Sequence, residues 1–329
     1  MSINLDKQVN RDILLWDNIA DESEKSVLSG HPDIIAYENF EEQLLDKILM
    51  ELTEKGNKPI KLVDICTGAG RIPEHYHNKI MNEEFPFNLN HIHGIDISKR
   101  ALEMAESKLS GMDEDIVKRL NMTFELGSAF DLKEENDLSI PILVNLNNSI
   151  GTLQGYEGAQ QLFISMRKAV EKANGIGIIS CYSNNYIEDY ALNIYESAMQ
   201  VTGQPQWLEP TNYTSSEYKM LPKELKAFGN LSKDTYCDIY DQNGLLAEED
   251  YKLTRAPTKV RAVNITGNIK TYRGYSSMWY SPLIINQWIN SHWNGCKTYY
   301  IETKDLDEKL APFGQLAILD CGNHLNNIF

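Results

Sequence analysis

The sequence predicts an α/β protein with a doubly wound, mostly parallel seven-stranded sheet, an antiparallel last strand and a β-rich insert. Three observations lead to this fold class. Short apolar strands alternate with amphipathic helices up to about residue 183, which favours parallel pairing. From about residue 207 to residue 280 the alternation gives way to a β-rich pattern. The last two apolar runs are joined by a linker too short for a helical crossover, so they should pair antiparallel.

Short apolar runs bounded by turn residues predict the first five strands. These runs occupy residues 60–66, 91–97, 121–129, 141–147 and 175–183. Apolar residues at helical spacing predict helices over 36–55, from about residue 71, over 98–111 and over 157–173. Pro73 is acceptable only in the first turn of its helix, where no backbone donor is needed. Ser98 and Gly111 are typical residues for the start and the end of a helix.

The second half of the chain contains the insert and the return to the α/β pattern. A hairpin is predicted over residues 260–280 with Gly267 and Asn268 at its tip, and a turn over 242–244. Ser281 should then cap a helix that has Pro282 at its first position, and strands follow at 297–303 and 315–321. We therefore expect a helical cap over 1–58, a main domain over 59–200 and 281–329, and the insert over 201–280.

Composition limits the classes of function. The net charge is −16 and the sequence pI is about 4.9, which disfavours nucleic acid as a partner. The five cysteines are scattered without a C-x-x-C pair, which suits free thiols in a reducing cytoplasm. No apolar run has the length of a membrane span, so no membrane partner is expected. We expect a cytoplasmic monomer or homo-oligomer.

A glycine-rich turn directly after the first strand is the main functional signal. Ligands bind doubly wound sheets at the carboxyl ends of the strands, where Gly68 and Gly70 would let the backbone approach a ligand closely. Asp96 ends the second strand, where a carboxylate can hold both hydroxyls of a ribose. A dinucleotide turn would place a third glycine where this chain has Pro73. The turn therefore does not suit a pyrophosphate.

Four segments in order along the chain carry a family resemblance: "VDICTGAGR", "GIDIS", "LGSAFDL" and "ILVNLNNSIGTL". Together they resemble the class I S-adenosylmethionine-dependent methyltransferases, over about residues 60–185 and 275–321. The resemblance implies S-adenosyl-L-methionine as the cofactor and S-adenosyl-L-homocysteine as the product. One departure is Ser128, which stands where the family often has an acid. The implied cofactor-binding residues are Trp16, Tyr37, Asp64, Thr67, Gly68, Gly70, Arg71, Asp96, Ile97, Ser128, Ala129, Phe130, Asn145 and Asn147.

The fourth segment is similar to that of small-molecule N-methyltransferases such as glycine N-methyltransferase. This similarity implies that Asn148 approaches the acceptor, and Tyr182, at the end of the fifth strand, is the second catalytic candidate. The β-rich insert would then act as a substrate lid, with its aromatic and basic residues on the acceptor. The predicted substrate-binding residues are Asn148, Tyr182, Arg261, Arg273, Tyr275, Trp279 and Tyr280. The alternative is that Asn148 caps a strand end while these aromatic residues only pack the lid.

The resulting hypothesis is methyl transfer to a small molecule, at nitrogen of an amine, amino acid or heteroaromatic metabolite. The alternatives are a small-molecule O-methyltransferase, an NAD-dependent dehydrogenase and a non-catalytic cofactor-binding protein. No metal is predicted, because the histidine pairs at 75 and 77 and at 91 and 93 lack a third ligand with recognisable spacing.

Overall fold

A computed structural model gives the structure of the chain. The residues that it describes are 13, 16–17, 20, 32–56, 58–136, 138–153, 155–186, 208–211, 235–239, 259–262, 275–306 and 312–325.

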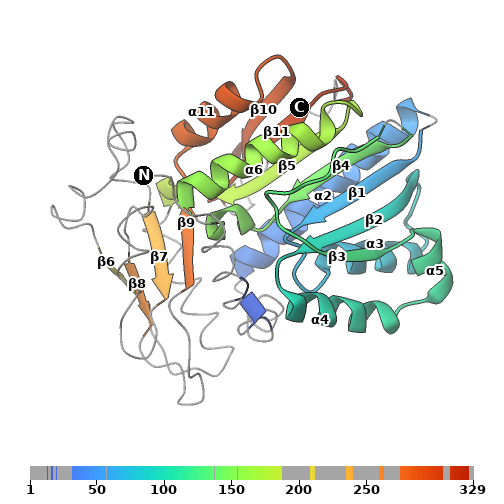
Figure 1. The fold of residues 1–329 in the computed structure, drawn as a ribbon, viewed down its shortest axis with the longest axis horizontal. Coiled ribbons are helices and arrows are strands. Elements are labelled where there is room, and N and C mark those ends of the chain that lie inside the picture. Colours follow the sequence, from blue (N-terminus) through green and yellow to red (C-terminus); the bar gives the residue numbers. More distant parts are fainter. Residues whose placement is uncertain are drawn as a thin grey trace.

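The seven-stranded sheet follows the predicted topology (Figure 1). Its strands are β1 (Ile60–Ile65), β2 (Leu89–Asp96), β3 (Thr123–Leu126), β4 (Ile140–Asn145), β5 (Ile176–Tyr182), β10 (Lys297–Glu302) and β11 (Gly314–Asp320). They lie in the order β10-β11-β5-β4-β1-β2-β3. The pairs among β1 to β5 are parallel, whereas β11 is antiparallel to both β5 and β10. The prediction of a mostly parallel sheet with an antiparallel last strand is confirmed.

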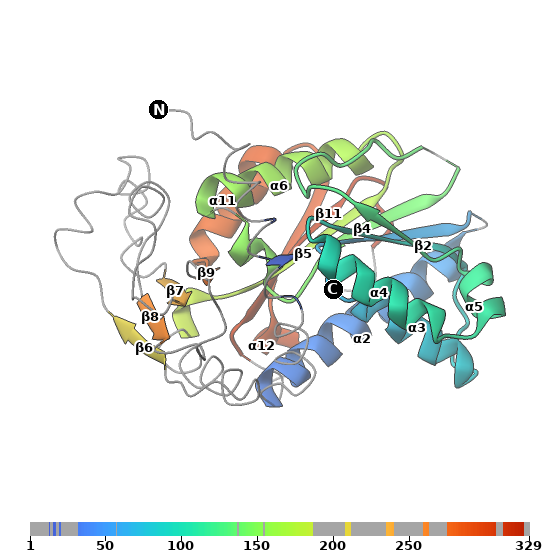
Figure 2. The same ribbon diagram turned by 60° about the horizontal axis from the view of Figure 1, so that its bottom comes forward.

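Helices cover both faces of the sheet (Figure 2). One face carries α2 (Pro32–Lys55), α3 (Arg71–Met81), α4 (Lys99–Ser110) and α5 (Glu114–Arg119). The other face carries α6 (Gly155–Val170) and α11 (Pro282–His292). Each face has its own apolar core, and α2 contributes a long buried stripe to the first one. None of the helices in the described ranges is long and apolar enough to cross a membrane.

Helices α3, α4 and α11 begin at the residues that the sequence predicts. Helix α3 begins at Arg71, so Pro73 lies in its first turn. Ser98 caps α4 and accepts a hydrogen bond from the backbone of Ala101, while Gly111 follows its last residue. Ser281 caps α11 in the same way. Shorter elements are η1 (Ser149–Thr152), η2 (Asn184–Tyr186) and α12 (Thr303–Leu306).

The described part of the insert consists of four strands in two antiparallel pairs. They are β6 (Leu208–Thr211), β7 (Thr235–Ile239), β8 (Lys259–Ala262) and β9 (Tyr275–Trp279). Within the described residues the two arms of the predicted hairpin pair with earlier strands, β8 with β6 and β9 with β7. The predicted hairpin tip at 267–268 and the turn at 242–244 lie outside the described residues. Tyr280 forms a parallel bridge with Ser183, so the end of the insert meets the end of β5.

Candidate functional site

The turn after β1 is built from left-handed backbone conformations. Cys66, Gly68 and Gly70 have φ angles of 63°, 56° and 81°. A Cβ atom on Gly70 would lie 3.2 Å from Ala105, so Gly70 allows α4 to pack closely. A Cβ atom on Gly68 would meet nothing within 4 Å. The two glycines therefore differ: Gly70 serves packing, and Gly68 faces open space that a ligand can enter.

Asp96 lies beside this open glycine at the end of β2. Its side chain is 8% exposed, and it accepts hydrogen bonds from the backbone of Gly68 and of Ser98, each at 2.8 Å. A carboxylate that accepts one bond on each oxygen still has lone pairs for ligand hydroxyls. Burial raises the pKa of Asp96, and the backbone donors oppose that rise.

The described residues of the N-terminal segment lie at the same edge. Asp17 accepts hydrogen bonds from the Ser98 hydroxyl at 2.8 Å and from the Arg100 backbone at 3.1 Å. Trp16, its neighbour, is half-buried. Asp17 is thus held at the start of α4, and the role of Trp16 toward a cofactor stays a prediction.

Asp64 is the second buried acid of the site. It is 4% exposed, and its Oδ2 accepts a hydrogen bond of 2.7 Å from the Thr67 hydroxyl. Burial raises the pKa of Asp64 to about 7, with Asp96 and Glu41 adding to the rise and Arg71 opposing it. A positively charged neighbour would stabilise the ionised form of a carboxylate that is buried in this way.

Glu41 on α2 is a residue that the sequence reasoning missed. It is 1% exposed, and its Oε2 lies 2.7 Å from Nη2 of Arg71. Its Oε1 accepts a hydrogen bond of 2.7 Å from the Asn147 backbone and contacts the Ser180 hydroxyl. Burial raises the pKa of Glu41, and the Arg71 charge opposes that rise. The signal in the sequence was an acid at a core position of the apolar stripe of α2.

Arg71 is held by α2 as well as by its place in the glycine turn. Besides Glu41, its Nη1 lies 3.1 Å from Glu42. The sequence predicts that Arg71 binds the cofactor. In the structure its guanidinium contacts carboxylates of α2, so it also acts as the link between α2 and α3.

A turn of asparagines follows β4. Asn147 and Asn148 both adopt left-handed conformations, with φ angles of 51° and 56°, which asparagine tolerates better than most residues. The Tyr182 hydroxyl donates to Oδ1 of Asn147 at 2.8 Å, and the Tyr182 backbone donates to Oδ1 of Asn148 at 3.0 Å. The Asn147 amide donates to Glu38 at 2.8 Å. The structure thus brings together Asn147, Asn148 and Tyr182, which the sequence had placed on two separate strand ends.

Asn145 lies at the start of the same turn and is fully buried. Its amide donates to the carbonyl of Ile65 at 3.0 Å and ties β4 to β1. Its Oδ1 has no hydrogen-bond partner among the described residues. A buried acceptor of this kind indicates a missing donor.

The third predicted motif lies along the edge next to Asp96. The Gly127 backbone donates to the carbonyl of Asp96 at 2.9 Å. Ser128 accepts a hydrogen bond from the Phe130 backbone at 3.2 Å, Ala129 is buried, and Ile97 is half-buried. The segment thus begins next to Asp96, and the roles of Ile97, Ser128, Ala129 and Phe130 toward a cofactor stay predictions.

Three predicted ligand-facing aromatic residues are buried in the described structure. Tyr37, Trp279 and Tyr280 are all 0% exposed. The Tyr37 and Trp279 rings pack on Tyr182, with centroid distances of 5.5 and 4.9 Å. The Tyr37 hydroxyl lies 2.6 Å from the Ser180 hydroxyl. Their observed contacts are with the protein core, and their roles toward ligands stay predictions.

The remaining predicted substrate residues belong to the insert. Arg261 lies on β8 opposite Glu209, and Tyr275 lies on β9 opposite Ile239. The side chains of Arg261 and Tyr275, and the whole of Arg273, lie outside the described residues. Their part in binding stays a prediction.

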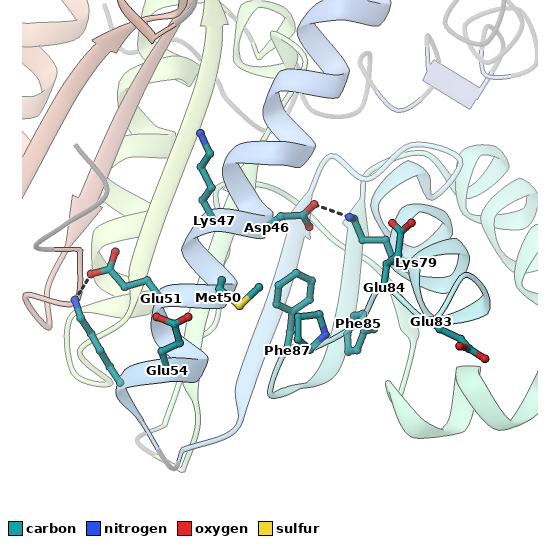
Figure 3. Close-up of a pocket in the computed structure, with 12 residues that line it drawn as sticks. Asp46, Lys47, Met50, Glu51, Glu54, Lys79, Glu83, Glu84, Phe85 and Phe87 are labelled. Carbon is teal, nitrogen blue, oxygen red and sulfur yellow. Dashed lines mark hydrogen bonds and ion pairs between the residues drawn. The ribbon is translucent and has the colours of Figure 1, made fainter.

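A groove of about 880 Å³ lies away from this site (Figure 3). It is lined by the second half of α2 and by the loop before β2, which includes Phe85 and Phe87. That loop is at the amino ends of the strands, opposite the glycine turn. The groove is therefore not part of the candidate site.

The described residues contain no group of three His, Cys, Asp or Glu side chains that could hold a metal ion. His75 instead lies 2.9 Å from Glu42, and Nδ1 of His93 lies 2.8 Å from the Thr123 hydroxyl.

Comparisons with known proteins were made on sequence and on structure. No protein-family model and no curated protein matches the sequence. The structure of an S-adenosylmethionine-dependent methyltransferase from Clostridium acetobutylicum aligns over 95% of this chain and 98% of its own, with 10% identity and a TM-score of 0.48. The CcbJ methyltransferase from Streptomyces caelestis aligns over 92% and 96%, with 12% identity and a TM-score of 0.47. The small RNA methyltransferase HEN1 aligns over 85% of this chain and 25% of its own, with 13% identity and a TM-score of 0.42. These TM-scores lie below 0.5, so function is inferred from the residues of this chain.

Removing the Glu41 carboxylate should destabilise the protein strongly. Glu41→Ala removes one of the carboxylates that hold the Arg71 guanidinium and leaves the Asn147 backbone N–H without this acceptor, so we expect a loss of about 3 kcal/mol in the free energy of unfolding. Urea denaturation measures it. Glu54→Ala, at an exposed position of the same helix, is the control and should change stability by less than about 0.5 kcal/mol. Equal effects of the two substitutions would contradict the role of Glu41.

Asp64 should make stability depend on pH. Its pKa rises from 3.8 to about 7 on folding, so the folded protein holds the proton more tightly than the unfolded chain. Its contribution is therefore complete below about pH 4 and is lost as the pH rises through about 7, by up to about 4 kcal/mol. Asp64→Asn keeps an acceptor for Thr67 and lacks this titration.

Urea denaturation of both proteins at several pH values tests the Asp64 prediction. The variant should gain stability relative to the unsubstituted protein as the pH rises from 5 to 8. A difference that stays constant with pH would show that the Asp64 carboxyl does not titrate in this range. Asp131→Asn, at an exposed position near the same edge, is the control.

Proposed function

We propose that this chain is an S-adenosylmethionine-dependent methyltransferase that acts on a small molecule. The acceptor atom is a nitrogen of an amine, an amino acid or a heteroaromatic metabolite. The observation that carries the proposal is the open side of Gly68 between two buried carboxylates, Asp64 and Asp96, in a turn with neither a third glycine nor a lysine. Such a turn suits a nucleoside that carries positive charge better than it suits a pyrophosphate.

The residues present fit the proposed cofactor. Asp96 would hold the ribose hydroxyls, and Asp64 would face the ammonium group of the methionine portion. The partnerless Oδ1 of Asn145 offers a further acceptor next to the turn. Ile97 and the segment 128–130 would contact the base. Bound in this way, S-adenosylmethionine supplies a methyl group on a positively charged sulfur.

The surplus of acids at this edge also supports a cationic ligand. Glu38, Glu41, Asp64 and Asp96 lie in or next to the site, and of these Arg71 forms an ion pair with Glu41. In a partly buried site these charges attract a sulfonium and an ammonium group, and they disfavour a phosphate.

The chain's own contribution to the reaction is the alignment of the acceptor. Well-oriented reactants gain on the order of 7–11 kcal/mol over reactants free in solution. The turn that contains Asn147 and Asn148 would position the acceptor, since it is fixed by Tyr182 and by Glu41. A tyrosine hydroxyl that donates one hydrogen bond can still accept another. Tyr182 is therefore our candidate to accept a hydrogen bond from the N–H group of the methyl acceptor.

The insert is our candidate for the acceptor lid. Its last strand leads through Tyr280 directly to the end of β5, next to Tyr182. A lid there would exclude water and hold a metabolite-sized acceptor, with Arg261 or Arg273 available for a substrate carboxylate. The net charge of −16 supports a small-molecule acceptor over a nucleic acid.

Isothermal titration calorimetry tests the cofactor. The protein should bind S-adenosylmethionine or S-adenosylhomocysteine and should not bind NAD. Asp96→Ala removes a charge-assisted contact to the ribose and should weaken binding by about 1.5–3 kcal/mol, or about 10- to 150-fold. Asp131→Ala is the matched control and should bind normally. Binding of NAD alone, or an unchanged affinity of the Asp96 variant, would contradict the assignment.

Methyl-labelled cofactor tests the acceptor. A panel of amines, amino acids, phenols, tRNA and peptides should show transfer to a small nitrogen compound. Asn148→Ala should mainly lower kcat, because it disturbs the alignment of the acceptor. If the acceptor carries a carboxylate, Arg261→Ala or Arg273→Ala should mainly raise KM. Transfer to tRNA or to a protein with no transfer to any small molecule would refute the small-molecule assignment.

A further inference from the structure

Two cysteines far apart in the sequence lie side by side at one end of the sheet. Cys296 directly precedes β10 and Cys321 directly follows β11, and their Sγ atoms are 3.4 Å apart. Both side chains are half-buried. We propose that Cys296 and Cys321 form a reversible disulfide when the protein meets a disulfide oxidant of the glutathione class.

The register of the strands supports this pairing. Lys297 and Asp320 are the last partners in the antiparallel ladder, so the next step outward places Cys296 opposite Cys321. The Cys321 backbone donates at 3.0 Å to Gly175, on the side of β5. Its N–H therefore points away from β10, as in a non-hydrogen-bonded pair, where opposite Cα atoms are closest. Such Cα separations fall within the range that a disulfide spans.

The cysteine pair has a positive charge beside it and no further metal ligand among the described residues. Arg167 on α6 donates to the carbonyl of His292 at 2.8 Å and to Asn294 at 3.1 Å, which fixes its charge beside the loop that carries Cys296. Burial raises the pKa of the Cys321 thiol, and the Arg167 charge opposes that rise. No third ligand among the described residues completes a metal site with the pair.

The reaction balances with oxidised glutathione as the oxidant. One cysteine thiolate attacks a sulfur of glutathione disulfide and releases one glutathione thiolate, which leaves a mixed disulfide. The second cysteine thiolate then attacks the protein sulfur of that mixed disulfide and releases the second glutathione. The two protein thiols lose two protons and two electrons, and the glutathione disulfide is reduced to two thiols.

The bridge should stabilise the fold because it ties together the ends of two paired strands. It would close a long loop across β10 and β11 and so restrict the unfolded chain. The glycine turn lies at the opposite edge of the sheet, at the carboxyl end of β1. Cofactor binding should therefore be the same in the bridged and reduced proteins, and this inference does not depend on the proposed function.

Alkylation and mass spectrometry test the proposal on the full chain. After equilibration with oxidised glutathione and denaturation, the protein should take up two fewer alkyl groups than the reduced protein, and a peptide map should link residues 296 and 321. The melting temperature should rise by a few degrees and return after treatment with dithiothreitol. Cys66→Ser keeps the pair and should behave in the same way.

Cys296→Ser removes one partner and should lose both the linkage and the reversible rise in melting temperature. Uptake of alkyl groups at every cysteine of the oxidised, unsubstituted protein would overturn the proposal. A peptide map that links a different pair of cysteines would overturn it as well.

Discussion

The ion pair between the buried Glu41 carboxylate and the half-buried Arg71 is the interaction on which the rest of the site depends. A buried carboxylate is costly unless every oxygen finds a donor or a positive charge. Glu41 meets this need by joining four elements: α2, the start of α3, the turn after β4 and, through Ser180, strand β5. One carboxylate from a helix that precedes the sheet thus connects Arg71, directly after the glycine turn, to the asparagine turn.

The same edge of the sheet concentrates negative charge. Asp64 has a pKa near 7 because the folded protein buries it beside other acids. That arrangement destabilises the protein without a ligand, and a positively charged ligand would offset the cost. The buried Asp64 carboxylate would therefore favour binding of a cation while it lowers the stability of the protein without one. Shifted pKa values of this kind are common at functional sites.

The antiparallel strand β11 connects the core to the region where we propose that the acceptor binds. Gln315 is fully buried, and its amide donates to the carbonyls of Tyr182 and Tyr280 at 3.2 and 2.7 Å. One side chain therefore holds both the end of β5 and the residue that closes the insert. This contact explains why a strand far along the chain contributes to the region where the acceptor is proposed to bind.

The sequence alone determined the order of the sheet strands, the long helices and the edge of the sheet at which we propose that the ligand binds. The signals that predicted these elements are local: apolar periodicity, Ser98 and Ser281 as helix caps, and the short linker before β11. Local signals can be interpreted without knowledge of the fold. The predicted hairpin in the insert was wrong in its pairing within the described residues, because a turn signal does not say which strands are neighbours.

Only the tertiary structure decided the partners of the charged and aromatic residues. Glu41 looks like one acid among many on α2, and Arg71 looks like a ligand contact, until folding brings them within 2.7 Å. Burial of Tyr37 and Trp279, and the meeting of Cys296 with Cys321, likewise depend on strands and helices distant in the sequence. The physical reason is that charge pairing and burial depend on distances in space, whereas the sequence records only distances along the chain.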